Sequence, residues 1–251
     1  KLKDGLTEDE MYPRITSKNF LVSFYGRINY SLDSRYVFTF SIRSDGSSKF
    51  APVQRWGVFP SGAFAWNIAK EDFMKEVPQI STMKLRISAG VTGQQDGIGD
   101  YVRFARYTSS SDPYHVVDMG NGNWTYPLWP LSYDPTIRWE TTVTYNAGVD
   151  FGFFKDRLSG SVDVYLRDTR DLLNEVQIPM GSNFGNKLMT NIGSVRNKGI
   201  EFALNGIPVQ TGGWSVQIGF NGTFQDTKFT KLNTTEDKNY YIEVGTISKG
   251  T

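Results

Sequence analysis

Residues 20–32 read FLVSFYGRINYSL, and residues 35–43, which follow Asp33 and Ser34, read RYVFTFSIR. In both stretches the even-numbered positions are apolar, apart from Gly26, and most odd-numbered positions are polar. A period of two is typical of a β-strand, because successive side chains point to opposite sides of it. Asp and Ser are common in tight turns. The two stretches therefore predict an antiparallel hairpin with one apolar face.

The same alternation returns along most of the chain. Apolar residues recur at every second position in six further stretches: 56–66, 83–91, 143–153, 158–166, 200–204 and 214–224. Together with the hairpin they predict eight strands, several of them longer than ten residues. Strands of soluble proteins average about five or six residues, so these are unusually long.

The links between the expected strands alternate between short and long. Short links are expected at 33–34, at a compact helical segment near 69–77, at 154–157 and at 207–213, whereas long links are expected at 45–55, 94–138, 168–190 and after 226. This order persists if the link 94–138 holds no extra strand or two extra strands, such as 101–107 and 114–118. Short turns at one end and long loops at the other are typical of outer-membrane β-barrels, in which the short turns face the periplasm.

Composition excludes several classes of site. The 251 residues include no cysteine and one histidine, His115, so neither a thiolate nucleophile nor a multi-histidine metal centre is available. The net charge is +1, which gives no electrostatic reason to expect nucleic acid. The longest apolar run is residues 63–66, too short for a membrane-spanning helix. We therefore expect no enzyme activity, no catalytic residues, no cofactor and no metal.

Several strings closely resemble the SusC/RagA family of TonB-dependent outer-membrane transporters. They occur in the family's order and extend over much of the chain. The matching strings are RSDGSSKF at 43–50, RWGVFPS at 55–61, KLRISAGVTG at 84–93, RWETT at 138–142, GVDFGF at 148–153, RLSGSVD at 157–163 and NIGSVRNKGIE at 191–201.

This resemblance implies an all-β fold, namely an antiparallel up-and-down segment of a transmembrane barrel that closes at about 22 strands. It also implies TonB-dependent import of glycan or peptide fragments across the Gram-negative outer membrane, in contact with the lipid bilayer and a SusD-like lipoprotein. We treat residues 1–251 as one region of the barrel. We expect the plug domain, its contact with TonB and the closing C-terminal strand to be absent from it.

A soluble alternative fits the alternation as well. A secreted β-sandwich that binds or cleaves carbohydrate would also bury one face of each strand. The length of the strands, the aromatic content of the apolar face and the order of the loops favour the barrel over the sandwich.

The long link 94–138, expected to be extracellular, is rich in aromatic residues. Aromatic rings stack on sugars and on peptide side chains, so the link is a candidate contact surface for substrate or lipoprotein. The candidate contact residues are Tyr101, Tyr107, Tyr114, Trp124, Tyr126 and Trp129. The alternative is that these rings pack against one another and stiffen a large loop.

Charged residues lie at the polar positions of the expected strands. If the apolar faces meet lipid, these residues line the lumen of the barrel. The candidates are Arg27, Arg43, Arg86, Asp150, Asp163 and Arg167. The arginines could guide acidic substrates, but the two aspartates point to the same side, so we favour mutual pairing within the wall.

Overall fold

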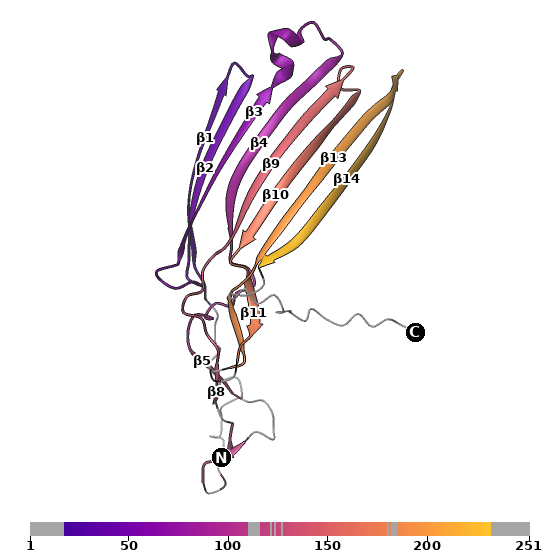
Figure 1. Cartoon of the computed structure of the whole chain (residues 1–251). Coiled ribbons are helices and arrows are strands. Elements are labelled where there is room, and N and C mark those ends of the chain that lie inside the picture. The colour runs from indigo at the N-terminus through magenta and orange to yellow at the C-terminus, as the bar shows by residue number, and fades with distance from the viewer. Residues whose placement is uncertain are drawn as a thin grey trace, which may run out of the picture.

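The structure is a computed structural model, and it describes residues 18–109, 116–120, 122, 124–126, 128–179, 181 and 185–231. Its main element is an eight-stranded antiparallel sheet in which each strand pairs with the strand before it in the sheet order β1-β2-β3-β4-β9-β10-β13-β14. Figure 1 shows these strands side by side as a tilted, curved wall. The expected up-and-down arrangement of eight strands is confirmed.

The strands of the wall have 12 to 18 residues each. Their bounds are β1 Leu21–Leu32, β2 Tyr36–Ser47, β3 Trp56–Asn67, β4 Ile80–Gln94, β9 Glu140–Phe153, β10 Leu158–Arg170, β13 Ser194–Thr211 and β14 Trp214–Lys231. Strands of this length are long enough to cross a bilayer, which takes about 9–11 residues at a tilt.

The register keeps the apolar positions of all eight strands on one face. Ile28 lies opposite Phe40, which lies opposite Gly62, and one strand further Ala89 lies opposite Tyr145. Ile28 is 69% exposed and Phe40 is 58% exposed. Among the described residues no second sheet covers this surface, which we call the apolar face. We call the opposite surface, which carries Arg86 and Asp150, the polar face.

Four compact connections lie at one end of the sheet, the upper end in Figure 1. Asp33 and Ser34 have positive φ angles of 51° and 55°, as a tight hairpin turn requires. Gly212 and Gly213 serve the turn from β13 to β14 in the same way, with φ of 53° and 90°. Phe154 also has a positive φ in the turn between β9 and β10.

The fourth compact connection consists of two short 3-10 helices between β3 and β4. They are η1 Ile68–Lys70 and η2 Asp72–Met74, and they confirm the helical link expected near 69–77. No helix in the described part of the chain is long and apolar enough to cross a membrane.

The connection expected at 207–213 is shorter than predicted, because β13 continues to Thr211. The register of β13 against β14 shifts between Gly206 and Val209, which is a β-bulge at Pro208. Arg157 stabilises this bulge: its carbonyl accepts from Ile207 N at 2.7 Å, and its guanidinium donates to the carbonyls of Ile207 and Pro208 at 3.2 and 3.0 Å. A proline lacks an N–H, and the bulge lets the strand continue past it.

The described part of the long link 94–138 adds no strand to the wall. Its short strands are β5 Arg106–Ser109, β6 Val117–Asp118, β7 Trp124–Thr125 and β8 Leu128–Leu131, and they pair only with one another, β5 with β8 and β6 with β7. The prediction of an extra wall strand at 101–107 was therefore wrong. The other expected segment, 114–118, begins with two residues that lie outside the described part of the chain.

The link between β10 and β13 holds a further two-stranded ribbon. It consists of β11 Leu173–Gln177 and β12 Lys187–Asn191. Like the ribbons of 94–138, it lies at the end of the sheet opposite the compact turns, which we call the loop end (Figure 1). The long connections therefore gather at one end of the wall, as their order along the chain predicts.

Candidate functional site on the polar face and its loop platform

Arg86 is the centre of an ion network on the polar face. Its Nε and Nη2 donate to the two carboxylate oxygens of Asp150 at 2.9 and 2.7 Å, and Nη2 also donates to Asp163 at 3.0 Å. The three side chains come from β4, β9 and β10, and each is between 16% and 34% exposed. The planar fork of a guanidinium suits such charge-assisted hydrogen bonds with carboxylates. The pairing within the wall that we favoured from the sequence is present here.

Gly148 makes the longer of these contacts possible. It lies on β9 directly opposite both Arg86 on β4 and Asp163 on β10. A Cβ built at this position would overlap the carboxylate of Asp163 and would lie 3.1 Å from Arg86 Nη2. The missing side chain of Gly148 therefore provides the space in which Arg86 reaches across a whole strand.

The other candidate residues of the polar face have separate local partners. Arg43 donates through Nε to both carboxylate oxygens of Asp45 at 2.8 and 2.7 Å. Arg27 lies over the ring of Tyr25 at 5.7 Å, and Arg167 lies over the ring of Tyr165 at 4.8 Å from its centroid. The structure thus brings together Arg86, Asp150 and Asp163 but leaves Arg27, Arg43 and Arg167 apart. Their expected position in a lumen remains a prediction.

A buried apolar cluster lies where the long loops meet the polar face at the loop end. We call it the loop platform; its members are Phe50, Phe59, Ile98, Val102, Ile137 and Trp139. The Trp139 ring lies 4.8 Å from Phe50 and 5.5 Å from Phe59, centroid to centroid. Trp139 Nε1 donates to the carbonyl of Arg55 at 2.9 Å. Phe59 belongs to the polar face of β3, so the loops fold over this face.

Asp134 fastens the long link to the ribbon of β11 and β12. Its buried carboxylate accepts from Thr136 N at 2.7 Å, from the Thr136 hydroxyl and from the hydroxyl of Thr190 on β12. The first of these contacts is an Asx turn, which the string Asp134-Pro135-Thr136 favours. This string is the signal in the sequence from which the role of Asp134 could have been predicted.

Asn191 provides a second connection between the same two loops. It accepts from Arg138 N and donates to the carbonyls of Arg138 and Asp171, all at 2.8 Å. Arg138 also pairs with Asp171 at 2.7 Å. The hydrogen bond from Arg138 to Asp171 raises the pKa of the Arg138 guanidinium, against the opposing effect of burial. No feature of the sequence indicated this connection, because it joins segments 53 residues apart.

Three arginines of the loop end each have an unpaired Nε. The Nε atoms of Arg55, Arg103 and Arg106 are buried and have no hydrogen-bond acceptor among the described residues. Burial and the nearby positive charge of Arg55 lower the pKa of the Arg103 guanidinium. A guanidinium N–H donates to a carboxylate or another anion. These three residues were not among the candidates from the sequence.

The aromatic residues of the long link differ in their surroundings. Tyr101 is tied to the chain before β1, since its hydroxyl accepts from Lys18 N at 3.2 Å and donates to Lys18 O at 3.4 Å. Tyr107, Trp124 and Tyr126 are 62%, 65% and 46% exposed. Tyr114 and the side chain of Trp129 lie outside the described residues. Tyr101 thus has a structural contact, whereas the three exposed rings are available to a partner.

Glu71 occupies the opposite, short-turn end of the wall. Its carboxylate accepts from Trp66 Nε1 at 2.9 Å, from the Tyr36 hydroxyl at 2.7 Å and from Arg35 at 3.1 Å. The hydrogen bond from Trp66 is the largest cause that lowers the pKa of the Glu71 carboxyl; the bond from Tyr36 and the charge of Arg35 act in the same direction, and burial opposes them. Glu71 therefore joins the compact helical connection to the ends of β2 and β3.

Comparison with known proteins identifies the family of this sheet. A family model described as TonB dependent receptor-like, beta-barrel, matches residues 3–245. The chain belongs to this family. The barrel assignment and the resemblance to SusC/RagA transporters are thereby confirmed, and the soluble sandwich is set aside.

Relatives within the TonB-dependent receptor family match almost the whole chain. The TonB-dependent receptor SusC of Bacteroides thetaiotaomicron is 43% identical over 235 residues, which cover 93% of this chain and 23% of SusC. The TonB-dependent receptor P39 of Formosa agariphila is 36% identical over 90% of this chain and 21% of its own length. This chain therefore spans less than a quarter of these two receptors.

Solved structures of the same family agree with the wall described above. The structure of the RagAB peptide transporter superposes with a TM-score of 0.74 at 30% identity and covers 85% of this chain and 23% of the matched chain. The same score and identity are found for the RagAB peptide importer in its open-open state. The eight strands thus have the arrangement of a segment of a TonB-dependent barrel wall.

Proposed function

We propose that this chain forms part of the wall of an outer-membrane importer that takes up glycan or peptide fragments with energy supplied through TonB. A SusD-like surface lipoprotein is the proposed partner outside the cell. The single observation that carries the proposal is the uncovered apolar face on strands long enough to span a bilayer. Membership of the TonB-dependent receptor family supports the same conclusion.

In this proposal the two faces of the wall contact different environments. The apolar face meets lipid, because only hydrocarbon lowers the free energy of so many exposed aromatic and aliphatic side chains. The polar face lines the lumen, and on it the guanidinium of Arg86 pairs with the carboxylates of both Asp150 and Asp163. The compact turns lie in the periplasm and the loop end lies outside the cell.

The loop platform supplies a rigid base for contacts with substrate or lipoprotein. Tyr107, Trp124 and Tyr126 project from short strands and the segments beside them, and exposed aromatic rings suit stacking on sugar rings and on peptide side chains. Tyr114 and Trp129 remain predicted contact residues.

The peptide class has support from the name of one relative, whereas the glycan class rests on the resemblance to the SusC/RagA family. One relative of known structure is a peptide transporter by its title, and the more identical SusC is a TonB-dependent receptor. Both relatives are described as a receptor or a transporter, which supports transport over catalysis as the role of this chain. We therefore keep glycan and peptide fragments as the two proposed substrate classes.

The lipid-facing arrangement is tested with single cysteines, which the cysteine-free chain allows. Fluorescent labels at Phe38, Val149 and Phe220 on the apolar face are expected to be quenched by lipid-soluble reagents. Matched labels at Ser88 and Asn146 on the polar face are expected to respond only to water-soluble quenchers. Protection of the first three labels from both kinds of quencher would exclude a lipid-facing wall.

The role of the exposed rings is tested by uptake. Tyr107→Ala, Trp124→Ala and Tyr126→Ala in the membrane-assembled transporter are expected to reduce uptake of oligosaccharide or peptide fragments by at least about tenfold when combined, since each lost stacking contact contributes about 0.5–1.5 kcal/mol. Phe73→Ala, an exposed ring at the short-turn end, serves as the control. Equal uptake by the triple variant and the control would contradict a contact role for these rings.

A further inference from the structure

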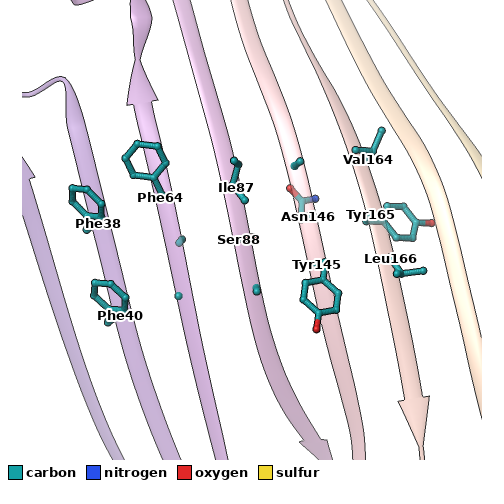
Figure 2. A pocket seen from close by; sticks show the side chains of 14 residues that line it. Phe38, Phe40, Phe64, Ile87, Ser88, Tyr145, Asn146, Val164, Tyr165 and Leu166 are labelled. Atoms are coloured by element: carbon teal, nitrogen blue, oxygen red, sulfur yellow. The ribbon is translucent and has the colours of Figure 1, made fainter.

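The apolar face carries a shallow groove in its middle. The groove has a volume of about 580 Å³, and Figure 2 shows Phe38, Phe40 and Phe64 toward one side of it and Tyr145, Val164 and Leu166 toward the other. The small residues Gly62, Ala89 and Ala147 line it between these larger side chains. Its apolar-face lining consists of hydrocarbon and aromatic groups, so an alkyl chain is the chemistry that it suits.

The apolar face becomes charged at the loop end of three consecutive strands. On β10, β13 and β14 the register row Val164–Ile200–Phe224 is apolar, the next row on this face is Leu166–Lys198–Asp226, and the one after that is Asp168–Arg196–Lys228. Each step of two residues along a strand is about 6.6 Å. The surface therefore changes from hydrocarbon to charge within a distance typical of the border between acyl chains and headgroups.

This charged border has an excess of cations. Along the described wall strands, every Lys or Arg at an apolar-face position falls within it: Arg170, Arg196, Lys198, Lys228 and Lys231. Only two carboxylates, Asp168 and Asp226, share the surface with these five cations. We call this group of seven residues the cationic margin.

Two of the three lysines of the margin, Lys198 and Lys228, are only loosely engaged. Arg196 forms a two-point contact with Asp168 at 2.6 and 3.1 Å. In contrast, Lys198 and Lys228 share Asp226 at 3.8 and 3.4 Å, which is longer than an ordinary N–H···O hydrogen bond. Their side chains are 60% and 70% exposed. Their ammonium groups therefore keep donors for a further anion.

The groove and the margin are adjacent. Leu166 lines the groove on β10, and the residue directly opposite it on β13 is Lys198. Neighbouring strands lie about 4.8 Å apart. Lys198 therefore lies one strand beyond the edge of the groove, and Lys228 lies one strand further. An amphiphile whose alkyl chain occupies the groove can thus place an anionic group against both lysines.

We propose that the groove and the cationic margin form a binding site for a phosphate-bearing glycolipid of the outer leaflet. An acyl chain lies in the groove and a phosphate accepts from Lys198 and Lys228. This inference rests on the proposed function in one respect, since it requires that the apolar face meets the outer membrane. The charge of the margin favours a lipid phosphate over a second copy of this wall, because two identical cationic margins repel each other.

The site is tested with the full-length transporter purified in detergent and titrated with phosphorylated lipid A, dephosphorylated lipid A and inorganic phosphate, with bound lipid read by native mass spectrometry. The unmodified protein is expected to bind the phosphorylated lipid at least tenfold more tightly than the dephosphorylated one. The double variant Lys198→Gln and Lys228→Gln is expected to lose this preference, because each basic residue contributes about one kcal/mol to attraction by anionic lipid. Lys155→Gln, at the short-turn end, is the matched control.

A second variant separates the groove from the margin. Ala89→Leu fills the groove and is expected to weaken binding of both forms of lipid A, whereas Val162→Leu, on the same face outside the groove lining, leaves binding unchanged.

Equal affinity for the two forms of lipid A, or competition by inorganic phosphate alone at equal concentration, would overturn the proposal. So would a loss of dimers in Ala89→Leu with unaltered lipid affinity, which would assign the groove to a second copy. The quenching experiment on Phe38, Val149 and Phe220 reports the orientation of the wall separately, so failure of the glycolipid site is distinguishable from failure of the proposed function.

Discussion

Arg86 on β4 and Asp150 on β9 form a two-point contact at 2.9 and 2.7 Å, and the same guanidinium continues to Asp163 on β10 at 3.0 Å. Arg86 thus ties three neighbouring strands of the wall together through side chains, in addition to their backbone hydrogen bonds. Gly148, which lies between these side chains on β9, determines whether the third strand is included. Two predictions follow from this geometry.

Removing the guanidinium should leave two carboxylates close together on the polar face. We expect Arg86→Ala to lower the free energy of unfolding of the membrane-assembled barrel by about 1–2 kcal/mol, less than for a fully buried pair because the side chains are partly exposed. Urea titration followed by the heat-dependent shift in gel mobility measures this. Arg27→Ala, which removes only a contact with the Tyr25 ring, should cost less than about 0.5 kcal/mol. Equal costs for the two variants would contradict the network.

Gly148→Ala tests the space between the strands. The added Cβ overlaps the Asp163 carboxylate, so this side chain must turn away from Arg86, and we expect a cost of about 1–2 kcal/mol. Gly206→Ala is the matched control, because a Cβ at Gly206 meets no atom within 4 Å. In a protein that already carries Asp163→Ala, the change Gly148→Ala should cost much less than it does in the wild type, because the overlapping carboxylate is gone. An equal cost in both proteins would show that the added Cβ overlaps with another group.

Glu71 predicts a dependence of stability on pH at the short-turn end. Its pKa is lowered in the folded protein, chiefly by the hydrogen bond from Trp66, so the ionised carboxylate favours folding. This contribution is fully present above the pKa of the unfolded state, about 4.3, and is lost as the pH falls through the lower folded pKa. Melting temperatures of the wild type should therefore fall more steeply below about pH 4.3 than those of Glu71→Gln. Glu76→Gln, on an exposed neighbour, should keep the wild-type slope.

The loop platform should unfold independently of the wall. Phe50 is fully buried against Trp139, so Phe50→Ala should destabilise the platform by about 3–4 kcal/mol. The expected result is faster proteolysis within the long links 94–138 and 168–190, measured on intact cells, with an unchanged gel shift of the barrel. Phe73→Ala, 61% exposed at the other end, is the control. Loss of the folded barrel in Phe50→Ala would show that platform and wall unfold together.

Much of the wall was predictable because its physics is local. The alternation of Phe24, Ile28, Phe38 and Phe40 requires only that strands have a period of two. In contrast, the end of β13 was misplaced, because Pro208 usually stops a strand. Here a bulge lets the strand continue past the proline, and the guanidinium of Arg157, about 50 residues away in the chain, donates to the carbonyls of Ile207 and Pro208.

The candidate site was predictable in part. The polar positions of Arg86, Asp150 and Asp163 placed them on one face, but contact between them depends on the register of three strands. Asp134 had a local signal in its turn sequence, whereas Asn191 had none because its partners Arg138 and Asp171 lie 53 and 20 residues away in the chain. The sequence did not distinguish Tyr101 from Tyr107. In the structure Tyr101 is hydrogen-bonded to Lys18, whereas Tyr107 is exposed.

The sequence by itself determined the strand period, the order of short and long connections and the separation of apolar from polar faces, because each depends on residues close together in the chain. The tertiary structure alone decided how closely each cation is paired with a carboxylate. Arg86 is satisfied because register places two carboxylates within reach, while Lys198 and Lys228 share one distant carboxylate beside an apolar groove. Charge balance at a surface depends on distances between strands, and these distances exist only once the sheet is assembled.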